Sequence, residues 1–170
     1  MHQPRWNTRA ERPADVPAIH DINVAAFGTP AEANLVDALR ADASWIVGLS
    51  MVVTDARDRP VGHALLTRCH IGDVPALCLA PCAVLPAHQR EGAGSAAIRA
   101  ALNAAREMGE HFVVVLGHPD YYPRFGFRRA STAGIRLGIE IPDDALMALS
   151  LDGARRLPRG EVRYAEPFGI

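Results

Sequence analysis

The stretch from Leu79 to Met108, LAPCAVLPAHQREGAGSAAIRAALNAAREM, limits the possible folds of this chain more than any other. An apolar run ends at Pro86, a polar loop with two glycines follows, and small and apolar residues then recur at helical spacing. This pattern predicts a strand, a loop and a helix. Gly92 and Gly94 stand at the predicted helix start, whose first amides lack partners within the helix. The helix dipole adds a positive potential there, so the sequence predicts a site for phosphate or pyrophosphate.

The spacing of the loop fits neither the dinucleotide motif GxGxxG nor the nucleoside triphosphate motif GxxxxGK. Instead, the strand end Val84-Leu85-Pro86 followed by QREGAG resembles the acetyl-CoA pyrophosphate loop of the GNAT N-acetyltransferase superfamily. An ordinary tight turn is the alternative reading of the two glycines. The resemblance implies that the loop and helix start bind the cofactor acetyl-CoA through Gln89, Arg90, Glu91, Gly92, Ala93, Gly94 and Ser95.

Three β-rich runs precede this loop: Trp45–Thr54, Val61–His70 and Ala76–Leu85. The polar segment DARDRP between the first two predicts a hairpin turn. Pro81 interrupts the third run, which indicates a bulge or a point where strand pairing stops. An extended ligand with amide groups could bind there like an added strand.

The GNAT resemblance implies a splayed sheet that receives the pantetheine arm at this interruption, through backbone groups around Cys82, Ala83 and Val84. In a regular strand, Cys78 and Cys82 would share one face. Both are expected to be buried structural thiols, because nothing marks either as activated.

The remaining elements complete a mixed α/β domain. A strand over Arg5–Arg9, a helix that Arg12-Pro13-Ala14-Asp15 opens and Gly28 ends, and a second helix over about Ala31–Ala41 are expected before the hairpin. A buried strand parallel to the third run is expected over His111–Gly117. The end of the chain predicts a strand, a loop and a strand. We therefore expect one domain over residues 1–170, with a GNAT-type sheet splayed between the fourth and fifth strands and flanked by helices.

The segment LGHPDYYPRFGF carries the second part of the resemblance. Tyr122 stands four residues before Gly126-Phe127, a spacing common in GNAT proteins, and the whole phrase is similar to the YhbS-like branch, which has Asp where this chain has His118. A tyrosine hydroxyl stays protonated near neutral pH, so Tyr122 is our candidate catalytic acid. The alternative is an aromatic plug that packs Tyr121, Tyr122 and the neighbouring phenylalanines against the sheet.

Acetyl transfer also needs a group that takes a proton from the amine. Glu32, His63, His70 and His118 are candidates for this general base, and so is a water chain, but each side chain has an ordinary structural role as an alternative. No cysteine occupies a recognised nucleophile position, so we expect direct transfer in a ternary complex. A non-catalytic acyl-CoA-binding module and a protein that binds a different nucleotide diphosphate remain open at this point.

Composition narrows the partners. Lys and Arg total 18 against 19 Asp and Glu, and a net charge of -1 provides no general field that would attract nucleic acid or a membrane. Three cysteines without a CxxC pair and the lack of a signal peptide or membrane span favour the cytoplasm. The His and Cys spacing fits no zinc site, so no metal is expected. The expected acceptor is a small-molecule or peptide amine, and exposed sheet ends could support a homodimer.

Overall fold

The computed structural model describes residues 5–170, so residues 1–4 of the expected domain lie outside this range. Its strands form one mixed sheet in the order β1-β2-β3-β4-β5-β8-β6, with β9 paired to β3 and β7 paired to β9. The strands are β1 (Asn7–Ala10), β2 (Ser50–Thr54), β3 (Pro60–Ile71), β4 (Val74–Val84), β5 (Phe112–Leu116), β6 (Arg128–Arg129), β7 (Ile135–Leu137), β8 (Leu146–Ser150) and β9 (Gly160–Arg163).

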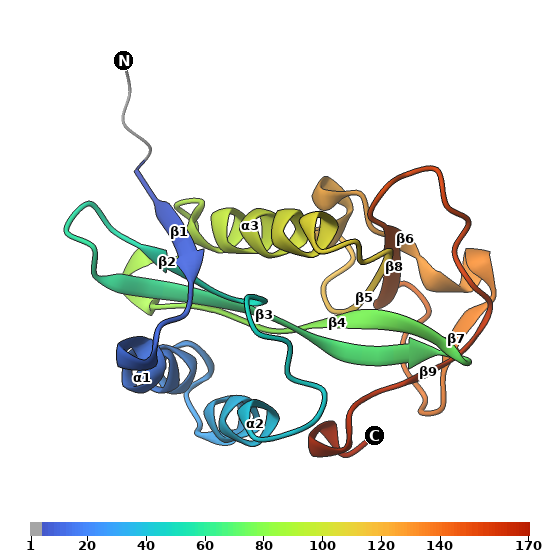
Figure 1. Cartoon of the computed structure of the whole chain (residues 1–170), viewed down its shortest axis with the longest axis horizontal. Coiled ribbons are helices and arrows are strands. Elements are labelled where there is room, and N and C mark those ends of the chain that lie inside the picture. The colour runs from blue at the N-terminus through green and yellow to red at the C-terminus, as the bar shows by residue number, and fades with distance from the viewer. Residues whose placement is uncertain (1–4) are drawn as a thin grey trace.

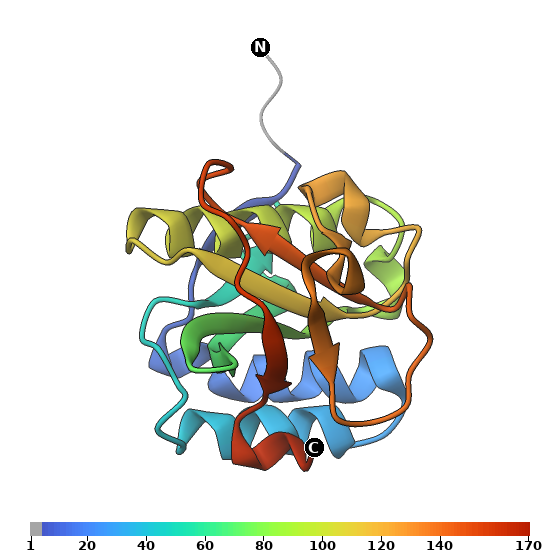
Figure 2. The same ribbon diagram turned by 90° about the vertical axis from the view of Figure 1, so that its right-hand side faces the viewer.

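Three α-helices cover the sheet: α1 (Val16–Phe27), α2 (Ala31–Arg40) and α3 (Ala93–Glu107). Short 3₁₀ turns span Pro13–Asp15 (η1), Pro86–His88 (η2), Tyr122–Phe125 (η3), Ala130–Ala133 (η4) and Glu166–Phe168 (η5). The helix α3 lies on one face of the sheet, and α1 and α2 lie on the other (Figure 1). Figure 2 shows β7 and β9 side by side at one end of the molecule, between the two helical layers.

The packing of α3 follows from its sequence. Ala97, Ala101 and Ala105 recur every four residues, and all three are buried against the sheet with Ile98 and Leu102. Small side chains on this face let the helix lie close to the strands, and the apolar stripe removes the sheet surface from water. This arrangement fixes the start of α3 beside the end of β4.

The sheet opens between β4 and β5, as expected. These strands pair in parallel only at Leu77 with Val113 and at Cys78 with Val114. The register between β3 and β4 shifts just beyond that point, because Leu66 pairs with Leu79 whereas Ala64 pairs with Cys82. Pro81 lies inside this shift and has no amide hydrogen to donate, which accounts for the bulge.

The bulge overturns the expectation that Cys78 and Cys82 share a face. Cys78 packs with Ala76 and Ala80 on the face opposite α3, whereas Cys82 packs against the cluster beneath α3. One extra residue in the strand reverses the alternation of side chains. The bulge therefore turns the Cys82 side chain toward α3.

The expected strand over Trp45–Thr54 is too long. Its first half forms turns, in which the Trp45 amide donates to the Asp42 carbonyl and the Leu49 amide donates to the Ile46 carbonyl. Gly48 has φ of 95°, a left-handed conformation that breaks an extended strand. Strand β2 therefore begins at Ser50. The last part of the chain also holds more elements than the expected strand, loop and strand, because β6, η4 and β7 precede β8.

Candidate active site

The start of α3 forms the base of a cavity of about 480 Å³. Gly92 is the N-cap residue with φ of 91°, and the first bond within the helix joins the Ala96 amide to the Gly92 carbonyl at 3.0 Å. The amides of residues 93–95 therefore have no acceptor within α3. The cavity is lined by Val84, Gln89, Arg90, Gly92, Gly94, Ser95, Tyr121 and Arg124. This end of β4 and the start of α3 thus offer free N–H donors beside two arginines.

Six of the predicted cofactor residues line this cavity, and the others lie beside it in different ways. Ala93 is buried in the core beneath α3, so only its backbone faces the loop. The Glu91 carboxylate pairs with Arg5 at 2.6 Å, and its carbonyl accepts the Trp6 indole N–H at 2.9 Å. The loop is therefore anchored to the segment before β1. Cys82 and Ala83 lie further back on β4, next to the opening of the sheet.

Tyr121 and Arg124 line the cavity but were not predicted to be part of it. The hydroxyls of Ser95 and Tyr121 lie 3.0 Å apart in a hydrogen bond, which joins α3 to η3. The Arg124 guanidinium lies 4.4 Å from the centre of the Tyr121 ring, and its Nε donates to the Tyr121 carbonyl at 2.8 Å. The spacing of Tyr121 and Arg124, three residues apart on one turn, could have indicated that both face the same side.

Tyr122 lies on η3 and packs closely on the end of β5. A Cβ atom on Gly117 would lie 2.5 Å from Cε2 of the Tyr122 ring, so the ring fits there only because residue 117 is glycine. The Tyr122 ring also contacts Tyr121 and Phe127 edge to face, with centroids 5.1 and 6.0 Å apart. The predicted aromatic cluster therefore exists, and Tyr122 is part of it.

Burial keeps the side chains of Tyr122 and Cys82 neutral. Burial raises the pKa of the Tyr122 hydroxyl far above its ordinary value, and the adjacent Cys82 thiol raises it further. Burial also raises the pKa of the Cys82 thiol to about 12. A phenol in this environment is a hydrogen-bond donor throughout the neutral range, and a thiol here is not a thiolate.

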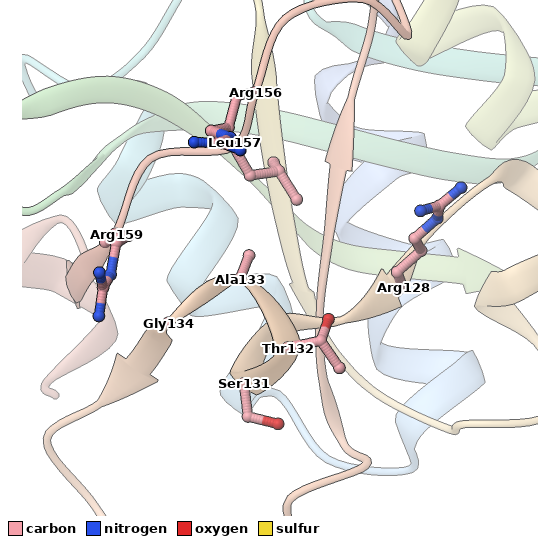
Figure 3. Close-up of a pocket in the computed structure, with 8 residues that line it drawn as sticks. All are labelled: Arg128, Ser131, Thr132, Ala133, Gly134, Arg156, Leu157 and Arg159. Atoms are coloured by element: carbon pink, nitrogen blue, oxygen red, sulfur yellow. The ribbon is translucent and has the colours of Figure 1, made fainter.

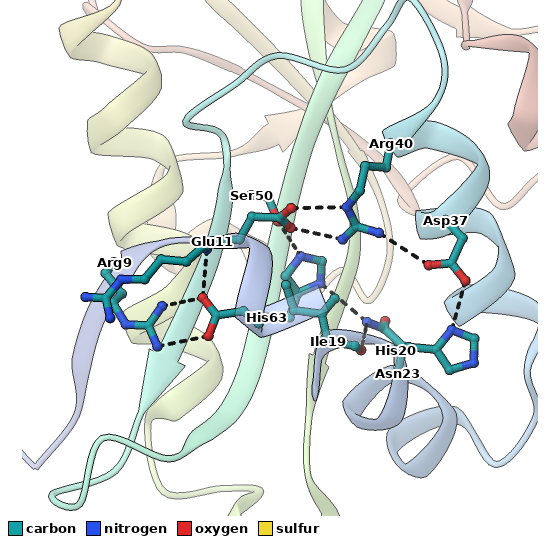
Figure 4. A network of polar contacts seen from close by, with 11 residues as sticks. Arg9, Glu11, Ile19, His20, Asn23, Asp37, Arg40, Ser50 and His63 are labelled. Atoms are coloured by element: carbon teal, nitrogen blue, oxygen red, sulfur yellow. Dashed lines mark hydrogen bonds and ion pairs between the residues drawn. The ribbon is translucent and has the colours of Figure 1, made fainter. Parts of the chain in front are cut away.

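His63 lies in a buried network beneath α1, shown in Figure 4. Its Nε2 lies 2.8 Å from the Ser50 hydroxyl, and its Nδ1 lies 3.4 Å from the Asn23 side-chain amide. The Ser50 hydroxyl in turn donates to the Glu11 carboxylate at 2.7 Å. Burial lowers the pKa of His63 to about 4, so the imidazole is neutral and satisfied.

The other base candidates are spread over the surface. His118 is exposed and its Nδ1 accepts the Asp120 amide at 3.3 Å. Glu32 lies in the first turn of α2. His70 lines a separate cavity beside β9, together with Arg68 and Arg163. Within residues 5–170, no three His, Cys, Asp or Glu side chains gather as metal ligands, and none of the helices is long and apolar enough to cross a membrane.

Comparisons with known proteins agree with this geometry. Residues 16–127 match the model of the acetyltransferase (GNAT) family. The chain is 36% identical over 162 residues to the uncharacterized N-acetyltransferase YjhQ of Escherichia coli K12, covering 91% of this chain and 89% of YjhQ. It is 31% identical over 163 residues to YhbS of the same organism, covering 94% and 96% of the two chains.

Two solved structures resemble the whole chain. The crystal structure of E. coli YhbS in complex with CoA superposes with a TM-score of 0.90 at 28% identity, covering 100% of this chain and 96% of YhbS. A GNAT acetyltransferase from Brucella melitensis in complex with acetyl-CoA superposes with a TM-score of 0.80 at 30% identity, covering 98% and 99% of the two chains. The splayed sheet, the glycine loop at the start of α3 and these similarities together make the chain a member of the GNAT family of acetyltransferases.

Proposed function

We propose that this protein transfers the acetyl group of acetyl-CoA to an amine, with the cofactor in the opening between β4 and β5. The observation that carries the proposal is the end of the β4–β5 ladder at Cys78, after which β4 has no strand partner on that side. The pantetheine arm contains two amide groups and can bind there like a short added strand. The structures of the two relatives in complex with CoA and acetyl-CoA support this placement.

In this proposal, the backbone of Cys82, Ala83 and Val84 binds pantetheine, and the loop binds the pyrophosphate. Val84 ends β4 and lines the cavity at the start of α3, so the two parts of the site are continuous. The free amides at the start of α3 and the Arg90 guanidinium would bind the phosphate oxygens. Gln89 donates to the Val84 carbonyl at 3.0 Å and would hold the loop against the strand. Glu91, Gly92, Ala93, Gly94 and Ser95 would contribute mainly backbone N–H groups.

The chemistry needs a donor at each of two developing charges. The amine nitrogen forms a bond to the thioester carbon, the oxyanion accepts hydrogen bonds from the free N–H groups of β4, and the C–S bond then breaks. We assign Tyr122 to the departing thiolate. Its raised pKa keeps the phenol protonated over the whole range in which the amine titrates, so the hydroxyl is available to donate a hydrogen bond to the thiolate.

Transfer is proposed to be direct, through a ternary complex. The pKa of Cys82 near 12 leaves its thiol neutral, and a neutral thiol is a weak nucleophile. The chain also offers no lysine side chain that could carry the acetyl group, because all 18 of its Lys and Arg residues are arginines. Mass spectrometry after incubation with acetyl-CoA alone should therefore find unmodified side chains, and a stable acetyl group on Cys82 would contradict direct transfer.

The acceptor is proposed to be a small-molecule or peptide amine, whose proton leaves through Glu32, His70, His118 or water. The burial and lowered pKa of His63 argue against that residue as the base. The free cysteines are compatible with a reducing compartment, and we propose the cytoplasm. A homodimer through the edge of the sheet remains a proposal that light scattering would test.

The proposal is tested by combining binding with turnover. Acetyl-CoA and CoA should raise the unfolding temperature well beyond ADP, because a ligand that binds the folded state stabilises it. Thiol release with a panel of amines should then reveal turnover, and Tyr122→Phe should lower kcat by about 100-fold, as expected for loss of a general acid. Tyr164→Phe is the matched control, because Tyr164 is also largely buried but lies beside Cys78 on the opposite face.

The two measurements test the cofactor site and the catalytic role of Tyr122 separately. Unchanged unfolding temperatures with both CoA compounds would exclude the cofactor site. Normal binding with an unchanged kcat in Tyr122→Phe would exclude Tyr122 as the acid and leave it as a packing residue.

A further inference from the structure

A second cavity lies away from the cofactor site, between η4 and the loop that leads to β9. Its volume is about 570 Å³, and it shares no lining residue with the cavity at the start of α3. The lining residues are Arg128, Ser131, Thr132, Ala133, Gly134, Arg156, Leu157 and Arg159. Figure 3 shows the three arginines around its rim, with the two hydroxyl residues between Arg128 and Arg159.

The charged side chains that line this cavity are all positive. Three arginines line it and no acidic side chain does, although the whole chain carries a net charge of -1. Among the ion pairs of residues 5–170, none involves Arg128, Arg156 or Arg159. The nearest acid bonded to a lining residue is Asp143, which accepts the Ser131 hydroxyl at 3.1 Å and pairs with Arg129 at 3.4 Å. Arg129 already neutralises that carboxylate.

The arginines next to these in the sequence do form ion pairs with carboxylates, as Arg129 does with Asp143. Arg155 precedes Arg156 directly and pairs with Asp152 at 3.6 Å. The three cavity arginines therefore differ from their sequence neighbours in lining one cavity without an ion-paired acid. A bound anion would supply the negative charge that this cavity lacks.

Gly134 supports the position of Arg159. Its φ is 78°, and a Cβ atom on this residue would lie 3.0 Å from Nε of Arg159. The glycine thus leaves room for the Arg159 side chain along the wall of the cavity. The Gly160 amide donates to the Gly134 carbonyl at 3.1 Å, which ties the two walls together. The cavity is held by backbone bonds on this side.

We propose that this cavity binds an organic anion with two or more negative charges, carried by phosphate or carboxylate groups. Guanidinium groups donate paired hydrogen bonds to the oxygens of either group. The volume exceeds that of a single phosphate ion and leaves room for a carbon skeleton against Leu157 and Ala133. The cavity shares no lining residue with the cavity at the start of α3, and its test does not require turnover.

The test is isothermal titration of the full chain with inorganic pyrophosphate and, separately, with citrate. Wild type should bind at least one of them saturably, and added salt should weaken the binding. Arg156→Ala/Arg159→Ala should weaken it by at least about tenfold, because hydrogen bonds to charged groups are lost. Arg128→Gln, on the other wall, should weaken it in the same direction.

The matched control is Arg57→Ala/Arg155→Ala, which removes the same charge from exposed positions outside the cavity. Pyrophosphate can also bind at the start of α3, and that contribution is common to all these proteins. Pyrophosphate binding that is lost in the cavity variant and kept in the control would assign phosphate groups to the site, and citrate binding with the same pattern would assign carboxylates. Equal affinity of the cavity variant and the control, or no binding by wild type, would overturn the proposal.

Discussion

Replacing Gly117 by alanine should displace the Tyr122 ring, because the three atoms nearest to the new Cβ all belong to that ring. The new Cβ would lie 2.5 Å from Cε2, 3.2 Å from Cδ2 and 3.3 Å from Cζ of the Tyr122 ring. Carbon atoms in contact prefer roughly 3.5–4.0 Å, so the ring must move by about 1 Å. Gly117 has no positive φ, and alanine therefore suits the backbone itself. The strain falls on the ring.

Two magnitudes follow from this displacement. Overpacking of a tight site costs about 1–3 kcal/mol, which for a domain of this size lowers the unfolding temperature by roughly 2–12 °C. A catalytic group displaced by about 1 Å loses on the order of 100-fold in rate. We expect Gly117→Ala to lower kcat by about that factor while acetyl-CoA still stabilises the protein, because the loop at the start of α3 is unchanged.

The assay is thiol release at saturating acetyl-CoA, combined with a double-mutant cycle. If Gly117→Ala acts by moving the Tyr122 hydroxyl, the substitution should have no further effect on kcat in a Tyr122→Phe background. An unchanged kcat despite a lower unfolding temperature would refute the reasoning. Additive effects on kcat in the double variant would show that the glycine acts through another group.

Two further predictions concern stability and pH. Folding lowers the pKa of His63 from 6.5 to about 4, so the unfolded chain binds the proton first, and up to about 3 kcal/mol of stability should be lost as the pH falls from 6.5 to 4. Urea unfolding of His63→Gln should show a smaller loss over this range, and equal losses would mean that His63 does not contribute. Glu110→Gln should cost about 0.5–1 kcal/mol at pH 7, because it breaks a two-point pair with Arg68 in which both bonds are 2.7 Å. Arg68 lowers the pKa of Glu110, so this cost should disappear as the pH falls below the ordinary range of a carboxyl group.

The central part of the fold could be predicted because its signals are local. Gly92 marks the helix start through its backbone, and the alanines of α3 show helical spacing within fifteen residues. Pro81 predicted a break in pairing because proline has no amide hydrogen in any context. The sequence does not show how the partner strand absorbs the extra residue, so the reversal of the Cys82 side chain was missed.

The side chains of the sites were harder to predict because they depend on contacts between distant segments. The network of His63 joins Asn23 on α1 and Ser50 on β2, and neither pairing has a local signal. Tyr121 belongs to an aromatic cluster whose composition is the same whether a ring fills the core or lines a cavity. Only the hydrogen bond between Tyr121 and Ser95 distinguishes these roles.

The anchoring of Glu91 has a practical consequence for preparing the protein. Trimming the chain to begin at Asn7, a routine step before crystallisation, would remove Arg5 and Trp6, which are two of the partners of Glu91. The ladder between β1 and β2 starts at Asn7 and would remain, but the Trp6 ring would no longer pack against the hydrophobic cluster beneath α3. The loop before α3 would lose its ion pair with Arg5 and its hydrogen bond from Trp6. Weak cofactor binding by the shortened protein would then reflect the loss of these contacts and not the affinity of the full chain.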